Sequence, residues 1–161
     1  MSQNRAAWAA HVERNEFDRD APKPSYDWSR PVSYDPRAKE AFHRAARRCL
    51  KALAAELGLA PGSYDLRSNK AGNAVSGEVT LHHDHVYVQV SQPVGGPANG
   101  YRTGVLIRTC EGRKDFSGGA NNFAPLAALD QTAKLANRVR AIVPELQAPD
   151  TDYEIEGPVF R

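Results

Sequence analysis

The segment 110–123 holds the residue types that anion binding requires. Arg113 and Lys114 supply positive charge. Glycines later in the segment give the backbone conformational freedom. Three successive N–H groups can therefore point toward an anion, and they belong to Ser117, Gly118 and Gly119. No Gly-Lys-Ser/Thr triplet follows at the spacing of a phosphate-binding P-loop. We therefore predict a loop that contacts an anion or a partner; the alternative is an ordered turn without a ligand.

Cys110 opens the same segment and directly follows a predicted strand. A thiol becomes a nucleophile when a neighbouring histidine or cation lowers its pKa, and both residue types occur in the chain. An enzyme or small-anion-binding domain centred on Cys110 and the glycine-rich loop is therefore one hypothesis. Neither a Gly-x-Ser-x-Gly sequence nor a papain-like cysteine sequence is present. We assign no catalytic residue and favour a protein that is not an enzyme.

Basic residues recur along the helix predicted to start at Pro36. Their spacing of three and four positions places them on one helix face, and they are Arg44, Arg47, Arg48 and Lys51. Such a face can follow nucleic-acid phosphates or contact an acidic protein surface. The alternative is the solvated outer face of an amphipathic helix, partnered by an acidic C-terminal tail. We predict a contact surface that combines these four residues with Arg113 and Lys114.

The run His82-His83-Asp84-His85 contains three imidazoles and a carboxylate, which are groups that bind zinc. Successive residues of a strand point to opposite faces, and a tight turn cannot surround a tetrahedral ion. We therefore expect polar turn residues here, with no metal site and no cofactor.

A capped amphipathic helix must position the basic residues. Asp35 is a capping residue, Pro36 fits the first helical position, and Gly58 is typical of a helix end. An apolar stripe recurs at helical spacing between them, formed by Phe42, Ala45, Ala46, Cys49, Leu50, Leu53 and Leu57. This stripe is expected to be buried, and Cys49 is expected to be an inert thiol.

From residue 64 onward the apolar period changes from helical to two. The alternation predicts strands at 64–67, 78–82, 86–90 and 103–109, with a hairpin turn at 83–85. A second helix is predicted to start at Pro125 and to continue until Pro144 stops it. We predict an α+β fold, in which an antiparallel meander sheet of three to four strands carries two main helices on one face, in the order α-β-β-β-β-α.

The chain of 161 residues fits a single compact domain with additions at both ends. We expect an N-terminal strap at 1–35 with a short helix at about Arg5–Asn15, the α+β domain at 36–144, and an acidic tail at 145–161. The net charge of +2 conceals an asymmetry, since the tail takes five acids and one base and leaves 20 basic against 14 acidic residues in 1–144. A moderately basic body permits polyanion binding.

The sequence also gives an expectation for the cellular compartment of the protein. The sequence shows no apolar run of a secretory signal and no stretch of roughly 20 apolar residues that would cross a bilayer. The chain has two cysteines, and nothing requires that they pair. We expect a cytoplasmic protein with reduced thiols and no membrane association.

Three stretches of the central third of the chain carry a resemblance: Ser76–Leu81, Val86–Gln92, and Cys110–Gly119 with Asn121-Asn122. Together they resemble a group of small uncharacterised proteins of bacterial phages and mobile elements. The resemblance implies a bacterial or phage accessory protein of the cytosol, and it implies no activity and no catalytic residue.

The leading hypothesis is a small non-enzymatic accessory protein of a bacterial phage or mobile element. It engages nucleic acid, or a host nucleic-acid-binding protein, through its basic residues. The Cys110-centred enzyme or anion-binding domain is the first alternative. The second is a protein-interaction module or an inhibitor of host defence that uses the acidic tail.

Overall fold

A computed structural model describes residues 16–17, 21–70, 77–92 and 104–147 of the chain. The first long element is helix α2 (Pro36–Glu56). The Asp35 side chain accepts a hydrogen bond from the Arg37 backbone N–H (3.2 Å), and Gly58 takes a left-handed conformation (φ +72°) just after the helix. Both ends of this helix therefore form where the capping residues predict them.

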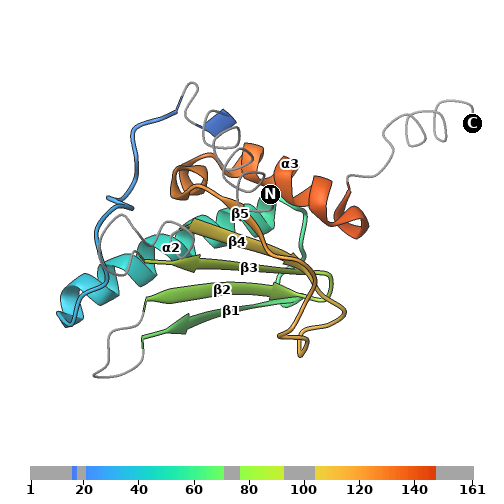
Figure 1. Cartoon of the computed structure of the whole chain (residues 1–161), viewed down its shortest axis with the longest axis horizontal. Coiled ribbons are helices and arrows are strands. Elements are labelled where there is room, and N and C mark those ends of the chain that lie inside the picture. The colour runs from blue at the N-terminus through green and yellow to red at the C-terminus, as the bar shows by residue number, and fades with distance from the viewer. Residues whose placement is uncertain (1–15, 18–20, 71–76, 93–103, 148–161) are drawn as a thin grey trace, which may run out of the picture.

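Five strands follow in one antiparallel sheet, ordered β1-β2-β3-β4-β5 as in the chain (Figure 1). They are β1 (Tyr64–Asn69), β2 (Glu78–His83), β3 (Val86–Ser91), β4 (Gly104–Thr109) and β5 (Asn122–Ala124). The α+β meander with its element order is confirmed, with one strand more than the predicted three to four. The extra strand β5 lies in the segment predicted as a loop. It has only three residues, too few to show an alternating pattern, and its pairing with β4 defines it.

Both main helices lie on one face of the sheet, as predicted (Figure 1). Alternate residues of the three central strands point toward them and are fully buried: Val79, Leu81, Val86, Val88, Val90, Val105 and Ile107. The apolar stripe of α2 packs on these residues from above, and Leu135 and Val139 of helix α3 (Thr132–Ile142) complete the core. The positions in between point to the opposite face, which no helix in the described part of the chain covers.

The second helix is not continuous, which corrects the prediction for Pro125–Pro144. A 3₁₀ helix η2 (Leu126–Asp130) precedes α3, and a second 3₁₀ turn η3 (Pro144–Leu146) follows it. The break falls at Gln131, whose backbone is not helical (φ −136°, ψ 59°). Its side chain donates a hydrogen bond to the Phe17 carbonyl. Contacts with the N-terminal segment therefore interrupt a helix that the local sequence would continue.

The N-terminal strap, described at 16–17 and from Ala21 onward, is fastened to the helices by aromatic packing. Trp28 is buried, its ring centroid lies 5.0 Å from that of Tyr26 and 6.5 Å from that of Phe42, and its Nε1 donates to Asp130 (2.7 Å). The helix predicted at Arg5–Asn15 and residues 148–161 of the predicted acidic tail lie outside the described residues.

Candidate functional site

Backbone hydrogen bonds fasten both ends of the glycine-rich loop after β4. The Cys110 backbone N–H donates to the His85 carbonyl (3.0 Å), and the Gly119 N–H returns to the Thr109 carbonyl (2.9 Å). The chain between these bonds folds against the open face of the sheet. There the ring of Phe116 lies 5.2 Å from that of His82. The loop is thus an ordered extension of the sheet.

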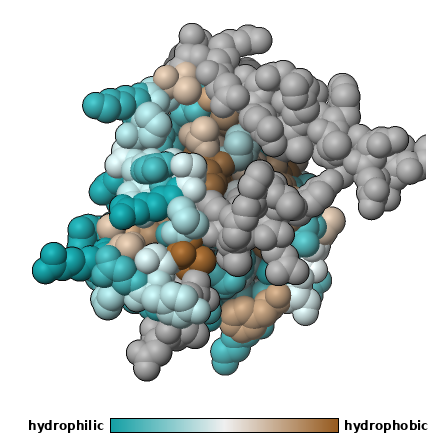
Figure 2. Space-filling view, turned by 60° about the vertical axis from the view of Figure 1, so that its left-hand side comes forward, coloured by the Kyte–Doolittle hydropathy of each residue, from teal (hydrophilic) through white to brown (hydrophobic). Residues whose placement is uncertain are grey.

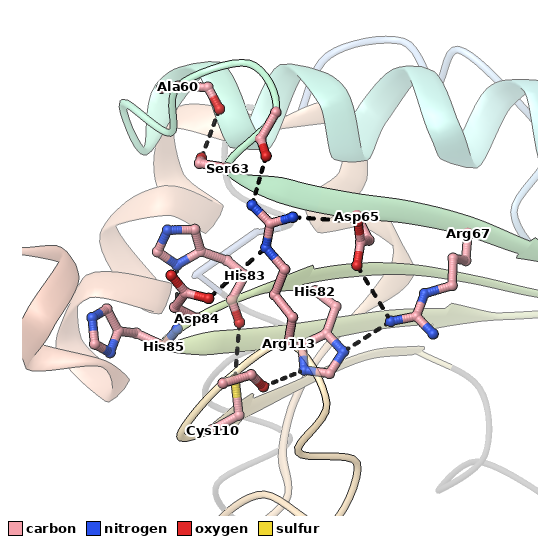
Figure 3. Close-up of polar contacts among 12 residues, drawn as sticks. Ala60, Ser63, Asp65, Arg67, His82, His83, Asp84, His85, Cys110 and Arg113 are labelled. Atoms are coloured by element: carbon pink, nitrogen blue, oxygen red, sulfur yellow. Dashed lines mark hydrogen bonds and ion pairs between the residues drawn. The ribbon is translucent and has the colours of Figure 1, made fainter.

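The Cys110 thiol is buried under this loop. Its Sγ donates to the His83 carbonyl (3.1 Å), a contact visible in Figure 3. Burial raises the pKa of the Cys110 thiol, with the nearby carboxylates of Asp115 and Asp84 acting in the same direction. A reactive cysteine needs the opposite environment, exposed and electropositive. The geometry therefore gives no support to a nucleophile at Cys110, and Cys49, also buried, has a raised pKa for the same reason.

The backbone amides that the sequence assigns to an anion are already bonded within the loop. The Ser117 and Gly118 N–H groups donate to Oδ1 of Asp115 (3.1 and 3.0 Å), and the Glu111 N–H donates to its Oδ2 (2.9 Å). These backbone bonds hold the pKa of the Asp115 carboxyl below its usual value. The third predicted donor, Gly119, is bonded to Thr109. The anion in this loop is the protein's own carboxylate.

Arg113 and Lys114 are neighbours in the sequence but differ in environment. Arg113 reaches across the edge of the sheet, where its Nη2 donates to the Gly62 carbonyl (2.6 Å) and its other nitrogens lie 3.5 Å from Asp65 and 3.8 Å from Asp84 (Figure 3). Two carboxylates thus balance its charge. Lys114 is exposed and makes no polar contact with the described part of the chain. Of the two predicted contact residues in the loop, Lys114 is the one whose charge is available to a partner.

The histidine run is divided between the two faces of the sheet. His82 is fully buried on the open face, where its Nδ1 accepts from Arg67 (3.3 Å) and its Nε2 therefore donates to the Gly112 carbonyl (3.0 Å). Burial lowers the pKa of His82, which keeps the ring neutral in this arrangement. Within the described residues, no group of three or more His, Cys, Asp or Glu side chains is arranged to hold a metal ion. His82 connects the loop to the sheet.

The basic face of α2 lies on the side of the helix turned away from the core. Arg44, Arg48 and Lys51 are exposed and form no hydrogen bond or ion pair with the residues that the structure describes. Arg47 lies at the flank of this face, and its Nη1 donates to the Leu66 carbonyl (3.0 Å) and to Oγ of Ser68 (3.2 Å) on the edge strand β1. Figure 2 brings forward the end of the molecule where α2 begins and shows hydrophilic side chains projecting along one flank.

A cleft of about 410 Å³ opens between α2 and β1, next to this basic face. It is lined by Glu40, His43, Arg44, Arg47, Ser68 and Lys70. Arg44 and Arg47 belong both to the predicted contact surface and to the cleft. His43 and Lys70 were not among the predicted site residues. Spacing along α2 cannot indicate Lys70, which follows β1, so the cleft that joins Lys70 to His43 is visible only in the folded chain.

Comparisons with protein-family models, with curated proteins and with solved structures find no match to this chain. In the described part of the chain, no helix has the length and apolar character needed to cross a membrane.

Proposed function

We propose that the chain is a non-enzymatic nucleic-acid-binding protein of a bacterial phage or mobile element, which contacts the sugar–phosphate backbone through α2. The observation that supports the proposal is the row of three exposed cations, Arg44, Arg48 and Lys51, which are unpaired among the described residues. Arg47 lies beside them and adds a fourth cation to this face.

The spacing of this row suits a phosphate backbone. An α-helix rises 1.5 Å per residue, so Arg44 and Lys51 lie about 10 Å apart along the axis. Phosphates of one strand follow each other at about 3.4 Å along a duplex axis, so the row spans about three of them. Long, exposed side chains can adjust to either a duplex or a single strand.

Repulsion between the like charges of this face destabilises the helix, and solvation of the face alone does not require such a charge arrangement. Arg44 and Arg48, and likewise Arg47 and Lys51, are separated by four positions, which brings like charges together on a helix and destabilises it by roughly 0.2–0.5 kcal/mol per pair. Glu40, one turn before Arg44, is the nearest acid on this face, and Lys70 already binds it (2.8 Å). A polyanion would relieve this repulsion.

The test is the salt dependence of binding. Fluorescence anisotropy with labelled 20-nucleotide single-stranded and duplex DNA and RNA gives the association constant between 50 and 300 mM salt. The triple variant Arg44→Gln/Arg48→Gln/Lys51→Gln removes three phosphate contacts. The slope of log K against log salt is negative, and its magnitude should be smaller by roughly 2 to 3 in this variant. Lys23→Gln, which removes an exposed lysine of the strap, is the matched control and should leave the slope unchanged.

Two results would contradict the proposal. One is wild-type protein that binds none of the four probes at 50 mM salt. The other is a triple variant that binds with the affinity and slope of the wild type, because binding would then use another surface.

A further inference from the structure

His43 lies in the wall of the cleft between α2 and β1 and has unused hydrogen-bonding capacity. Its side chain is 1% exposed, and neither Nδ1 nor Nε2 has a hydrogen-bond partner among the described residues. The ring packs edge-on against Phe42 (5.2 Å between centroids). Nearly all buried polar groups in proteins are hydrogen-bonded, and leaving one without a partner is unfavourable. The ring nitrogens of His43 are therefore available to form a hydrogen bond with a ligand in the cleft.

The charges around the cleft define the sign of that ligand. Arg44, Arg47 and Lys70 line it, against one carboxylate, Glu40. Lys70 lies 2.8 Å from Glu40 and neutralises it, so the lining keeps a net positive charge. The Lys39 ammonium, which donates to the Lys70 carbonyl (3.3 Å), adds to the positive potential at the His43 ring.

The polar groups of the cleft are held in place before any ligand arrives. Arg47 is anchored on β1 through Nη1 alone, and its other guanidinium nitrogens make no hydrogen bond within the described residues. Ser68 accepts the bond from Arg47 and keeps its own hydroxyl proton for another acceptor. The cleft thus combines fixed cations with neutral donors, the combination that recognises phosphate oxygens.

We propose that this cleft binds a phosphoryl group, held by Arg47 and Lys70 and accepting a hydrogen bond from the His43 imidazole. The inference rests on the proposed function and deepens it. Because Arg44 belongs both to the α2 row and to the cleft, a strand lying along α2 would place one of its phosphodiesters here. A free phosphate would present the same chemistry, and the experiment separates the two sources.

The experiment follows the His43 ring by NMR, through its Cε1–H resonance, in the full-length protein. Inorganic phosphate is titrated first, and the single-stranded 20-nucleotide probe is titrated separately in phosphate-free buffer. We expect a saturable shift of the His43 resonance with the oligonucleotide. A saturable shift with inorganic phosphate as well would show that the cleft accepts a free phosphoryl group.

Two variants identify the donors. Lys70→Gln removes a charged contact and should weaken binding of the responding probe about tenfold. His43→Phe keeps the ring packing on Phe42 and removes the donor, so it should weaken the same probe without changing the far-UV circular dichroism spectrum. Lys23→Gln is again the control.

The possible failures are distinguishable. Oligonucleotide binding that depends on Arg48 and Lys51 but leaves the His43 resonance and the Lys70→Gln affinity unchanged would overturn the cleft and keep the proposed function. A His43 response to phosphate in a protein that binds no oligonucleotide would support the phosphoryl site and overturn the nucleic-acid function. No response to either probe would overturn the site.

Discussion

Acid should destabilise this protein through the buried imidazole of His43. Burial, followed by the positive charge of Lys70 and assisted by Arg47 and Lys39 against the opposing Glu40, lowers the pKa of His43 from 6.5 to about 4. In the unfolded chain the ring titrates near 6.5. Between these values the unfolded state binds more protons, so the stability present above pH 6.5 is lost as the pH falls toward 4.

The size of the effect follows from the shift in pKa. One pKa unit corresponds to about 1.4 kcal/mol, so the shift is equivalent to about 3 kcal/mol in full. At pH 5 the unfolded ring is almost entirely protonated and the folded ring almost entirely neutral. About 2 kcal/mol of unfolding free energy should therefore be missing at pH 5 relative to pH 8.

The assay is urea unfolding followed by far-UV circular dichroism at pH 8 and pH 5 in phosphate-free buffer, for the wild type and for His43→Phe. His82 and His83, whose pKa values burial also lowers, are present in both proteins and cancel in the comparison. The wild type should lose about 2 kcal/mol more than the variant between the two pH values. Equal losses in both proteins would refute the neutral, unpartnered state inferred for His43.

Three further predictions concern the loop after β4. Arg113→Gln should reduce the free energy of unfolding by about 1 kcal/mol and speed hydrogen exchange of the loop amides. Lys114→Gln should change neither quantity. Equal effects of the two variants would contradict the role of Arg113 in holding the loop. Gly118→Ala should cost about 1–3 kcal/mol in urea unfolding, because its φ is +61° and a Cβ would lie 2.8 Å from the Thr109 carbonyl oxygen. Gly112→Ala, where a Cβ meets nothing within 4 Å, is the control, and a similar loss there would remove the conformational explanation. Cys110 should react with iodoacetamide at pH 7.5 at least roughly tenfold more slowly than free cysteine, as measured by peptide mass spectrometry; a rate equal to that of free cysteine would show an accessible thiol.

Much of the fold could be predicted because its signals are local. Asp35, Pro36 and Gly58 mark the ends of α2 by their own backbone and side-chain chemistry. The alternation of valine and leucine with other residues marks β2 and β3, and a run of apolar residues marks β4. The break at Gln131 has no such signal, since it depends on bonds to residues more than a hundred positions earlier.

The candidate site divides in the same way. The exposed row on α2 follows from helical spacing, which places its residues on one face wherever the helix lies. The cleft beside it requires the packing of α2 on β1, which no spacing within the helix reveals. The occupied amides of the loop were within reach of sequence reasoning. Asp115 precedes Ser117 by two positions, the spacing at which an aspartate bonds its own backbone in a turn.

The carboxylate of Asp130 links the N-terminal strap to the segment directly before α3. It accepts hydrogen bonds from the Ser25 N–H, the Ser25 hydroxyl and the Trp28 indole, and all three donors come from the strap. Asp130 is also the last residue of η2, directly before the helix break. Detaching the strap would free this carboxylate and remove the bond between Gln131 and Phe17, and both contacts lie at the helix break. The strap therefore covers the core and also holds the backbone around Asp130 and Gln131 in its observed conformation.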